Sequence, residues 1–482
     1  MPFAVAMPSG TMLGLLIVFF GLGVFGAAAT GCERSFTLTA GAVVHAFAGL
    51  LVVFAADLIT LLIGWEMLTF SAYFVIRARS KQLPHTGGSN AERASFWYIA
   101  AQISAAALFF IAIVVHAAET GSLAVAPLCR QAQPVMFVAI LIKTAMLPFH
   151  GWLVDGYPQA IPVASILLSV YATKVGVYTA ARVLAWTPNA VPVLSYVGAV
   201  VAVVAVLLAL LQRSARRLLS YHIISQVGYM LVGVGLAGVT ARADAGVTAG
   251  IFHAINHIIY KALLFTVVAT VMHRLGHDDL RRMGGLWRSM PLAFVCGIVG
   301  AAAISGVPFT SGYVSKELLK TASDPLPGYL LAVATIGTGL SFTKFVYLIF
   351  LRPSRPVIDR RASADPPVRM GMILLAVLSV LIGIVPTAVP GVPAHAYYGW
   401  SALWPGIWPL GLALVLWMLL RDLLVGGHKE RPVPTPLRTI LVVGSRPILL
   451  RLRLAHRLNP QIAVGIAVSA AIVATFLLVI LA

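Results

Sequence analysis

The sequence predicts an all-α polytopic membrane protein with about fourteen transmembrane helices. Of its 482 residues, 60% are hydrophobic and only 10% are charged, whereas a soluble domain has about 25% charged residues. Apolar runs of about 18 or more residues recur along the whole chain, and a run of that length is long enough to cross a bilayer as a helix. The runs lack the alternation that β-barrel strands need, so we expect helices.

The distribution of basic residues predicts the orientation of these helices. The formal net charge is +19, which in a soluble protein would suggest binding to nucleic acid. Here 25 basic residues lie in loops on one side of the predicted helices and four lie in loops on the other. Because basic loops face the cytoplasm, we expect no nucleic acid partner and a location in the cell's inner (cytoplasmic) membrane. Both termini are then on the non-cytoplasmic side.

Few residues in the chain are suited to holding a cofactor. Cys32, Cys129 and Cys296 are far apart and form no CxxC pair, so we expect no iron–sulfur or zinc site. We expect no cofactor in this chain and no catalytic centre of its own. The first ten residues, MPFAVAMPSG, have no basic n-region, which argues against a signal peptide.

Five lysines fall inside the apolar segments. A charged side chain at the bilayer centre costs about 2.5–3.5 kcal/mol on insertion scales, and such residues typically mark ion paths. A structural role is the alternative, because a lysine near a segment end can extend to the interface. We assign the set to an ion path: Lys143, Lys174, Lys261, Lys316 and Lys344.

Glu66, in LLIGWEMLTFSAYFVI, is the only carboxylate that the sequence places clearly inside an apolar helix. Lys143, on another helix, is a natural partner. Burial disfavours the charged form of a lysine, and a nearby carboxylate favours it. Opening and closing such a pair would therefore load and release a proton, although a static salt bridge between helices is the alternative.

A row of ionisable residues is predicted along one helix in GIFHAINHIIYKALLF. His253, His257 and Lys261 are spaced i, i+4, i+8, which stacks them on one face. Histidine titrates near neutral pH, so the row could pass protons through the membrane centre. Two histidines at this spacing could also bind a metal, but no third ligand is nearby, and we expect no metal site.

Two prolines interrupt long apolar runs and predict broken helices. Pro148 follows Lys143 by five residues, and Pro308 precedes Lys316 by eight. Proline removes a backbone hydrogen bond, and broken helices are typical of ion sites in inverted-repeat transporters. The spacing of the breaks predicts two inverted five-helix repeats. The predicted layout is an N-terminal helix (1–39), the two repeats (40–184 and 192–352), peripheral helices (353–424), a basic cytoplasmic or interfacial segment (425–462) and a C-terminal transmembrane helix (463–482).

Seven ordered motifs resemble a known family over roughly residues 40–350. They are the WE pair in the third segment, KTAMLPFHGWLVDGYPQAIPVAS, TKVGVYTAARV, RRLLSYHIISQVGYM, FHAINHIIYKALLF, MGGLWRSMP and ISGVPFTSGYVSKELL. The chain resembles the antiporter-like subunits shared by respiratory complex I, membrane-bound hydrogenases and Mrp-type Na⁺/H⁺ antiporters. SGYVSKE and HIIYKALLF are most similar to D-type Mrp subunits. Only one apolar segment precedes the 40–77 pair, where larger members have about three, so the family's N-terminal partner interface is not expected in full.

The resemblance implies a role for most of the buried residues. Glu66 and Lys143 match the family's ion pair, and Lys174 matches a relay lysine found in some members. His253, His257 and Lys261 match the central row, and Lys316 matches the terminal residue on the second broken helix. Lys344 matches no general family position.

The implied function is proton translocation within a multisubunit complex. The implied partners are the lipid bilayer and other membrane subunits. The driving force would be Na⁺ exchange, or electron transfer in an iron–sulfur or flavin arm on a separate chain. Two alternatives remain: the energising subunit of a two-part uptake system, for example for inorganic carbon, and a stand-alone cation/proton antiporter.

Overall fold

The computed structural model describes residues 36–82, 88–184, 191–236, 243–354, 366–389 and 397–425, with the single residues 14, 21 and 392. Every regular element in these ranges is helical. The predicted C-terminal transmembrane helix (463–482) lies outside the described residues, as do nearly all of the N-terminal helix (1–39) and of the basic segment 425–462.

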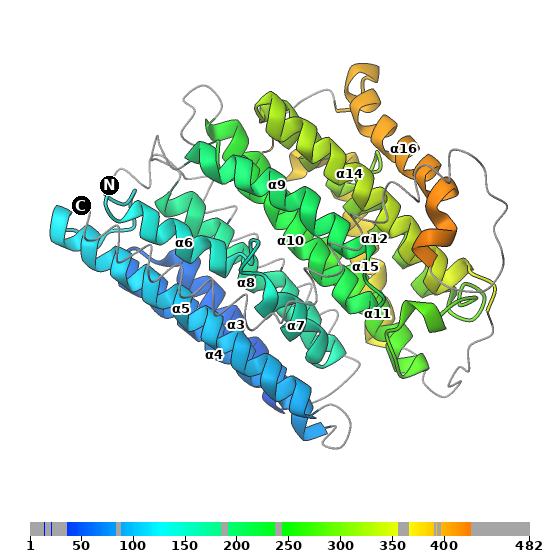
Figure 1. Cartoon of the computed structure of the whole chain (residues 1–482), viewed down its shortest axis with the longest axis horizontal. Helices are drawn as coiled ribbons and strands as arrows, with labels where there is room; N and C mark the ends of the chain where they lie inside the picture. The colour runs from blue at the N-terminus through cyan, green and yellow to red at the C-terminus, as the bar shows by residue number, and fades with distance from the viewer. Residues whose placement is uncertain are drawn as a thin grey trace.

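Figure 1 shows the helices in chain order. Their bounds are α3 (Phe36–Phe54), α4 (Leu58–Gln82), α5 (Gly88–Thr120), α6 (Gln133–Lys143), α7 (Gly151–Gln159), α8 (Pro162–Val183), α9 (Val191–Leu210), α10 (Ala215–Val234), α11 (Ala243–Leu275), α12 (Pro291–Ser305), α13 (Ser311–Ala322), α14 (Pro325–Val346), α15 (Pro366–Ile384) and α16 (Trp400–Val425), with short helical turns at Leu280–Arg282, Tyr347–Leu351 and Pro386–Ala388.

Within the described ranges, eight helices are long and apolar enough to cross a bilayer. They are α4, α5, α8, α9, α11, α14, α15 and α16. Shorter apolar helices lie at Thr39–Phe54, Gln133–Lys143 and Pro291–Ser305. The chain is therefore a multi-pass membrane protein, and the total of about fourteen spans stays a prediction.

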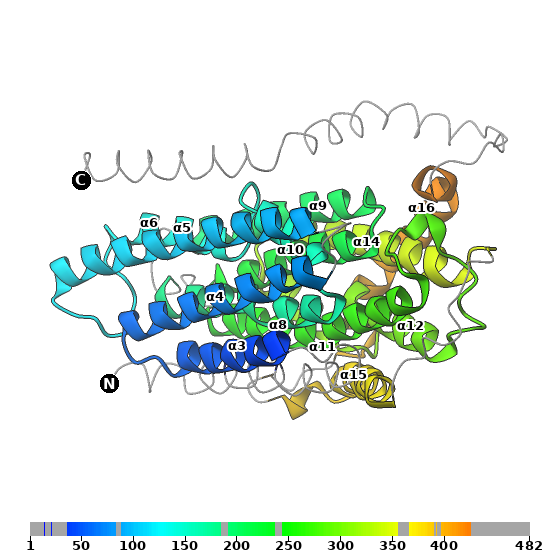
Figure 2. The same cartoon turned by 90° about the horizontal axis from the view of Figure 1, so that it is seen from below.

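The order of packing is similar in the two halves of the chain. In the first half, α3 packs on α4, α4 on α5, α5 on α6 and α7, and α8 returns to α3 and α4. In the second half, α9 packs on α10, α10 on α11, α11 on α12 and α13, and α14 returns to α9 and α10. Figure 2 shows α5 and α9 on one side of the molecule and α3 and α15 on the opposite side.

The two halves meet where α7 and α8 contact α10 and α11. The apolar window of α8 is completely buried and that of α11 is 94% buried, so these helices form the centre of the molecule. Arg217 of α10 forms an ion pair with Asp155 of α7 at 2.8 Å. The neighbouring Arg216 donates a hydrogen bond of 2.7 Å to the Ala160 carbonyl. Polar contacts therefore join the halves at one end of these helices.

Two non-helical linkers, which we call the first and the second break, separate α6 from α7 and α12 from α13. Pro148 lies in the first break, which also contains Ala145 in the left-handed region at φ 57°. Pro308 lies in the second break, after Gly306 has ended α12 at φ 80°. A left-handed residue commonly ends a helix, and glycine adopts this conformation without strain. Each proline is therefore in a linker between two half-helices.

Candidate functional site

Lys143 is the last residue of α6, and its side chain is buried between α4 and α8. Its Nζ donates to the Trp65 carbonyl at 3.3 Å and to Thr69 Oγ1 at 3.4 Å, both on α4. It also lies 4.7 Å from the centre of the Trp65 ring, a cation–π contact. Gly176 leaves the room that Lys143 needs, because a Cβ atom there would lie 3.2 Å from Lys143 Cγ.

Glu66 and Lys143 are near one another but are not in contact. Oε1 of Glu66 is buried and has no hydrogen-bond partner, and no ion pair of 4.0 Å or less joins the two side chains. Their charges still interact electrostatically. The predicted partner of Lys143 is therefore present, but in this structure the lysine donates to neutral oxygens of Trp65, the residue before Glu66, and of Thr69, three residues after it.

His45 of α3 is a buried ionisable residue that the sequence analysis missed. Its Nδ1 lies 2.5 Å from Ser71 Oγ, and its ring packs against Tyr171 of α8 with a centroid distance of 5.5 Å. Its charge state is coupled electrostatically to Lys143. The signal was the same as for the lysines, an ionisable residue within an apolar run.

Lys174 is a buried lysine of α8. Its Nζ donates to the Ser169 carbonyl and, at 3.4 Å, to Thr173 Oγ1. Its charge acts on His257 and Lys261 of α11. Lys174 therefore interacts with the central row, which we define as His253, His257 and Lys261.

The central row is completely buried on α11. His253 lies 2.9 Å from Ser315 Oγ and 3.1 Å from Gln226 Oε1 through its two ring nitrogens. Lys261 donates to the Leu219 carbonyl at 2.7 Å. Both ring nitrogens of His257 are buried without a hydrogen-bond partner. Leaving such groups unpaired is costly, so His257 is the least satisfied member of the row.

His222 of α10 is a second buried histidine that the sequence analysis missed. Its Nε2 lies 2.7 Å from Ser341 Oγ on α14, and its Nδ1 has no partner. It interacts electrostatically with Lys261 and Lys316. It lies in the RRLLSYHIISQVGYM motif, where only its histidine type in an apolar run could have identified it.

Lys316 lies beyond the central row, on α13. Its Nζ donates to the Ile304 carbonyl at 2.8 Å and lies 5.0 Å from the centre of the Tyr229 ring. Tyr229 in turn stacks on His253, with ring centroids 5.5 Å apart. The tyrosine ring therefore separates Lys316 from the nearest member of the row.

A buried carboxylate that the sequence analysis did not select follows Lys316 on α13. Glu317 has 8% of its surface exposed and forms an ion pair with Lys320 at 2.5 Å. Lys320 belongs to the last turn of α13. The polar sequence of this half-helix, SGYVSKELLK, gives no sign that Glu317 is buried. Neighbouring helices enclose α13 although its own composition is polar.

Lys344 lies away from the other lysines. Its Nζ donates to the carbonyls of Leu210 at 2.7 Å and Gln212 at 3.0 Å, at the C-terminal end of α9. The last carbonyls of a helix lack partners within the helix, and a cation near them is favourable. Lys344 therefore caps α9.

Metal binding has no support from the described part of the chain, where no three His, Cys, Asp or Glu side chains gather into a group that could hold an ion. His253 and His257, whose spacing could suit a metal, are separated in their contacts. His253 is bonded to Ser315 and Gln226, whereas His257 packs its ring against Tyr260 with centroids 5.4 Å apart.

These features define a class of protein: polytopic helical membrane proteins with two broken helices and ionisable side chains buried between them. A model of the transmembrane family described as NADH:quinone oxidoreductase/Mrp antiporter matches residues 55–341, and the chain belongs to this family. The resemblance found in the sequence motifs is thereby confirmed. The finer likeness to D-type Mrp subunits stays a prediction.

Two curated relatives illustrate the range of the family. The chain is 29% identical over 263 residues to NADH-ubiquinone oxidoreductase chain 5 of Triticum aestivum. This alignment covers 52% of this chain and 38% of the relative. It is 26% identical over 421 residues to Na(+)/H(+) antiporter subunit A1 of Staphylococcus haemolyticus, covering 76% of this chain and 52% of the relative. The chain thus spans about half or less of the length of these relatives.

Solved structures share the fold at low sequence identity. A chain of the Mrp complex from Dietzia sp. has a TM-score of 0.68 at 21% identity, covering 83% of this chain and 85% of that one. A chain of the membrane-bound sulfane sulfur reductase, an archaeal respiratory membrane complex, has a TM-score of 0.70 at 22% identity, with 98% and 87% covered. A chain of respiratory complex I from Thermus thermophilus has a TM-score of 0.64 at 22% identity, with 79% and 84% covered.

Proposed function

We propose that this chain is the proton-translocating, antiporter-like subunit of a multisubunit membrane complex. One observation carries the proposal: buried ionisable side chains extend from α4 and α6, through α8 and α11, to α13. Each such group costs free energy in a membrane span. A fold that needed only stability would have apolar residues at these positions.

The proposed path begins at Lys143. While Glu66 is close, its negative charge favours the protonated lysine, and when the carboxylate moves away, burial favours release. A tenfold change in proton affinity corresponds to about 1.4 kcal/mol, so a small movement of α4 relative to α6 is sufficient. Lys143 abuts α8 at Gly176, and Lys174 is a buried lysine of the same helix. In the proposed path the released proton passes to Lys174.

The path continues through the central row to Lys316. Lys174 is coupled to His257 and Lys261, and a neutral His257 can accept a proton on one of its unpaired ring nitrogens and release one from the other. From His253 the path follows Gln226, Ser315 and the face of Tyr229 to Lys316. His222 offers a parallel route, because it interacts with both Lys261 and Lys316. Glu317 and Lys320 form the far end of the path.

We propose further that the path is built on two inverted five-helix repeats, spanning 40–184 and 192–352. The corresponding order of packing in α3–α8 and α9–α14 supports this arrangement. Five crossings per repeat would place the second repeat upside down relative to the first. The remaining predicted parts are the N-terminal helix (1–39), the peripheral helices (353–424), the interfacial segment (425–462) and the C-terminal helix (463–482).

The proposed partners are other membrane subunits and the lipid bilayer. Na⁺ exchange or a redox arm on another chain would supply the driving force, and both kinds of complex occur among the relatives by name. We place the complex in the inner (cytoplasmic) membrane with both termini on the non-cytoplasmic side. The residues described here favour none of the alternatives, which are a two-part uptake system and a stand-alone antiporter.

The test compares two buried lysines that differ in position. In vesicles that hold the purified complex, proton movement is followed with a pH-sensitive dye after an imposed sodium gradient or addition of an electron donor. Lys143→Ala is expected to lower the rate at least about tenfold, because the loading site is lost. Lys344→Met is the matched control and is expected to retain the rate, since it removes only a cap on α9. Equal rates in Lys143→Ala and wild type would refute the proposal.

A further inference from the structure

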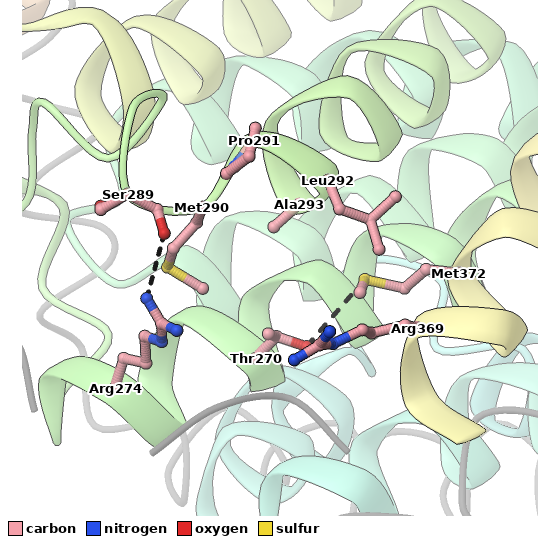
Figure 3. Close-up of a pocket in the computed structure, with 9 residues that line it drawn as sticks. All are labelled: Thr270, Arg274, Ser289, Met290, Pro291, Leu292, Ala293, Arg369 and Met372. Carbon is pink, nitrogen blue, oxygen red and sulfur yellow. Dashed lines mark hydrogen bonds between the residues drawn. The ribbon is translucent and has the colours of Figure 1, made fainter. Parts of the chain in front are cut away.

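A pocket of about 260 Å³ lies between α11, α12 and α15, outside the proposed proton path (Figure 3). Thr270 and Arg274 of α11 line it on one side, and Arg369 and Met372 of α15 on another. Residues 289–293, where α12 begins, form a third wall. Water occupies about 30 Å³ per molecule in the liquid, so the pocket is large enough for a polar group of several atoms.

The walls of the pocket favour an anion. Two arginines contribute to the lining, and none of the nine lining residues is acidic. Arg274 Nη1 donates to the Ser289 carbonyl at 3.1 Å, which fixes its guanidinium beside the pocket. Figure 3 shows the Arg369 side chain reaching back from α15 toward Thr270, on the side where Arg274 lies. The first turn of α12, which has no side-chain cap, adds the positive end of a helix.

The position of the pocket identifies the kind of anion. Arg274 is in the last turn of α11, Pro291 begins α12, and Arg369 is in the first turn of α15. The ends of membrane helices lie at the level of the lipid headgroups. All three helix ends belong to the side that carries the arginine-rich loops, where anionic lipids are attracted to basic residues.

The surface beside the pocket is suited to acyl chains. Large apolar side chains on α12 and α15 are exposed at helical spacing, and α12 packs against α15. They are Val295 and Ile298 on α12, and Met370, Ile373, Leu374 and Val377 on α15. A ligand with its phosphate between the arginines would therefore meet apolar surface directly below it.

We propose that this pocket binds the phosphate headgroup of an anionic phospholipid, with Arg274 and Arg369 on the phosphate and the acyl chains along α12 and α15. The bound lipid would join the end of α11 to α15. A phosphate diester matches the planar, multiple donors of guanidinium groups, and the apolar surface favours a lipid over a free anion. Basic pockets between helices on this side of a membrane are suited to such headgroups.

The test is native mass spectrometry of the purified full chain in detergent, after addition of phosphatidylglycerol or cardiolipin, with phosphatidylcholine as the neutral lipid. Wild type is expected to retain one anionic lipid in preference to phosphatidylcholine. Arg274→Gln/Arg369→Gln is expected to weaken that preference about tenfold, because two charges near the headgroup are lost. Arg421→Gln, an exposed arginine on α16, is the matched control and is expected to behave as wild type.

Two further arms keep the result interpretable. Arg274→Lys/Arg369→Lys preserves both charges and is expected to retain most of the preference, which separates loss of charge from loss of folding. Inorganic phosphate in excess is expected not to displace the lipid. An unchanged preference in the double glutamine variant, an equal loss in Arg421→Gln, or displacement by inorganic phosphate would each overturn the proposal.

Discussion

The two broken helices carry similar lysines in different electrostatic surroundings. Lys143 ends α6, and its carboxylate partner, Glu66, belongs to another helix and is not in contact with it. Lys316 is within α13, and Glu317 follows it on the same half-helix, already paired with Lys320 at 2.5 Å. A charge on a separate helix changes its distance when the helices move, whereas a charge on the same helix does not. The first break is therefore suited to switching Lys143 between its protonated and neutral forms. At the second break, the charges near Lys316 stay at a fixed distance from it.

The largest effect is expected from a variant that removes the charge of Glu66 and keeps Lys143. Glu66→Gln preserves the size of the side chain and removes only its charge. Lys143 then lacks the group that favours its protonated form, and we expect proton movement in vesicles holding the complex to fall at least about tenfold. Assembly should be unchanged, because the glutamine keeps an oxygen that can accept the hydrogen bond from Thr69, and Glu66 Oε1 has no partner to lose. A wild-type rate in Glu66→Gln would show that Lys143 loads its proton without this carboxylate.

A smaller effect is expected from the same change at the second break. Glu317→Gln leaves Lys320 without its charged partner, whereas Lys316 keeps its hydrogen bond to the Ile304 carbonyl. We expect a rate loss of less than about tenfold and a loss of about 1–3 kcal/mol in stability, because Lys320 keeps only its hydrogen bond to the Pro405 carbonyl at 3.3 Å. Thermal unfolding in detergent measures the second quantity.

The double variant Glu317→Gln/Lys320→Gln tests whether the loss of stability comes from the broken ion pair. Removing both charges leaves no unpaired ion, so part of the lost stability should return. A double variant less stable than both single variants would show that the ion pair is not what stabilises α13. If Glu317→Gln slowed proton movement as much as Glu66→Gln, the distinction between the two breaks would fail.

What the sequence could predict depended on the apolar composition around each residue. Lys143, Lys174 and Lys261 stand out because their neighbours are apolar, and the structure buries all three. Glu317 was not selected although Lys316, its neighbour on α13, was, and the structure buries both. His45 and His222 satisfied the rule that selected the lysines but lay outside the regular spacing that drew attention to α11.

The tertiary structure explains why buried residues with similar sequence surroundings have different contacts. Lys344 has the same apolar surroundings as Lys174, yet it meets two carbonyls at the end of α9. No pattern along α14 contains that information, because the contact joins residues more than 130 positions apart. The separation of Glu66 from Lys143 is likewise a distance between helices. Residue types therefore predict which groups are buried, and only packing determines which of them interact.

The smallest expected effect concerns how α4, the helix of Glu66, begins. Asp57 precedes α4, and its carboxylate accepts hydrogen bonds from the Thr60 backbone N–H at 2.8 Å and from the Thr60 hydroxyl at 2.7 Å. These bonds hold the pKa of the Asp57 carboxyl below its usual value of 3.8. The corresponding helix of the second half, α10, is capped by the neutral Ser214, which accepts from the Arg217 N–H. The charged cap therefore belongs to the first half.

The sign of the resulting pH dependence follows from the lowered pKa. The cap stabilises α4 fully above the unfolded pKa near 3.8 and is lost as pH falls through the lower folded value. We expect Asp57→Asn, which still caps a helix but cannot titrate, to match wild type near neutral pH. As the pH falls below about 4, wild type should lose roughly 1 kcal/mol more stability than Asp57→Asn, the typical value of a cap. Thermal unfolding in detergent across this range measures the difference. Parallel curves for the two proteins would mean that the ionised cap adds nothing to the positioning of α4, and that the Glu66 helix is held by packing against α3, α5 and α8 alone.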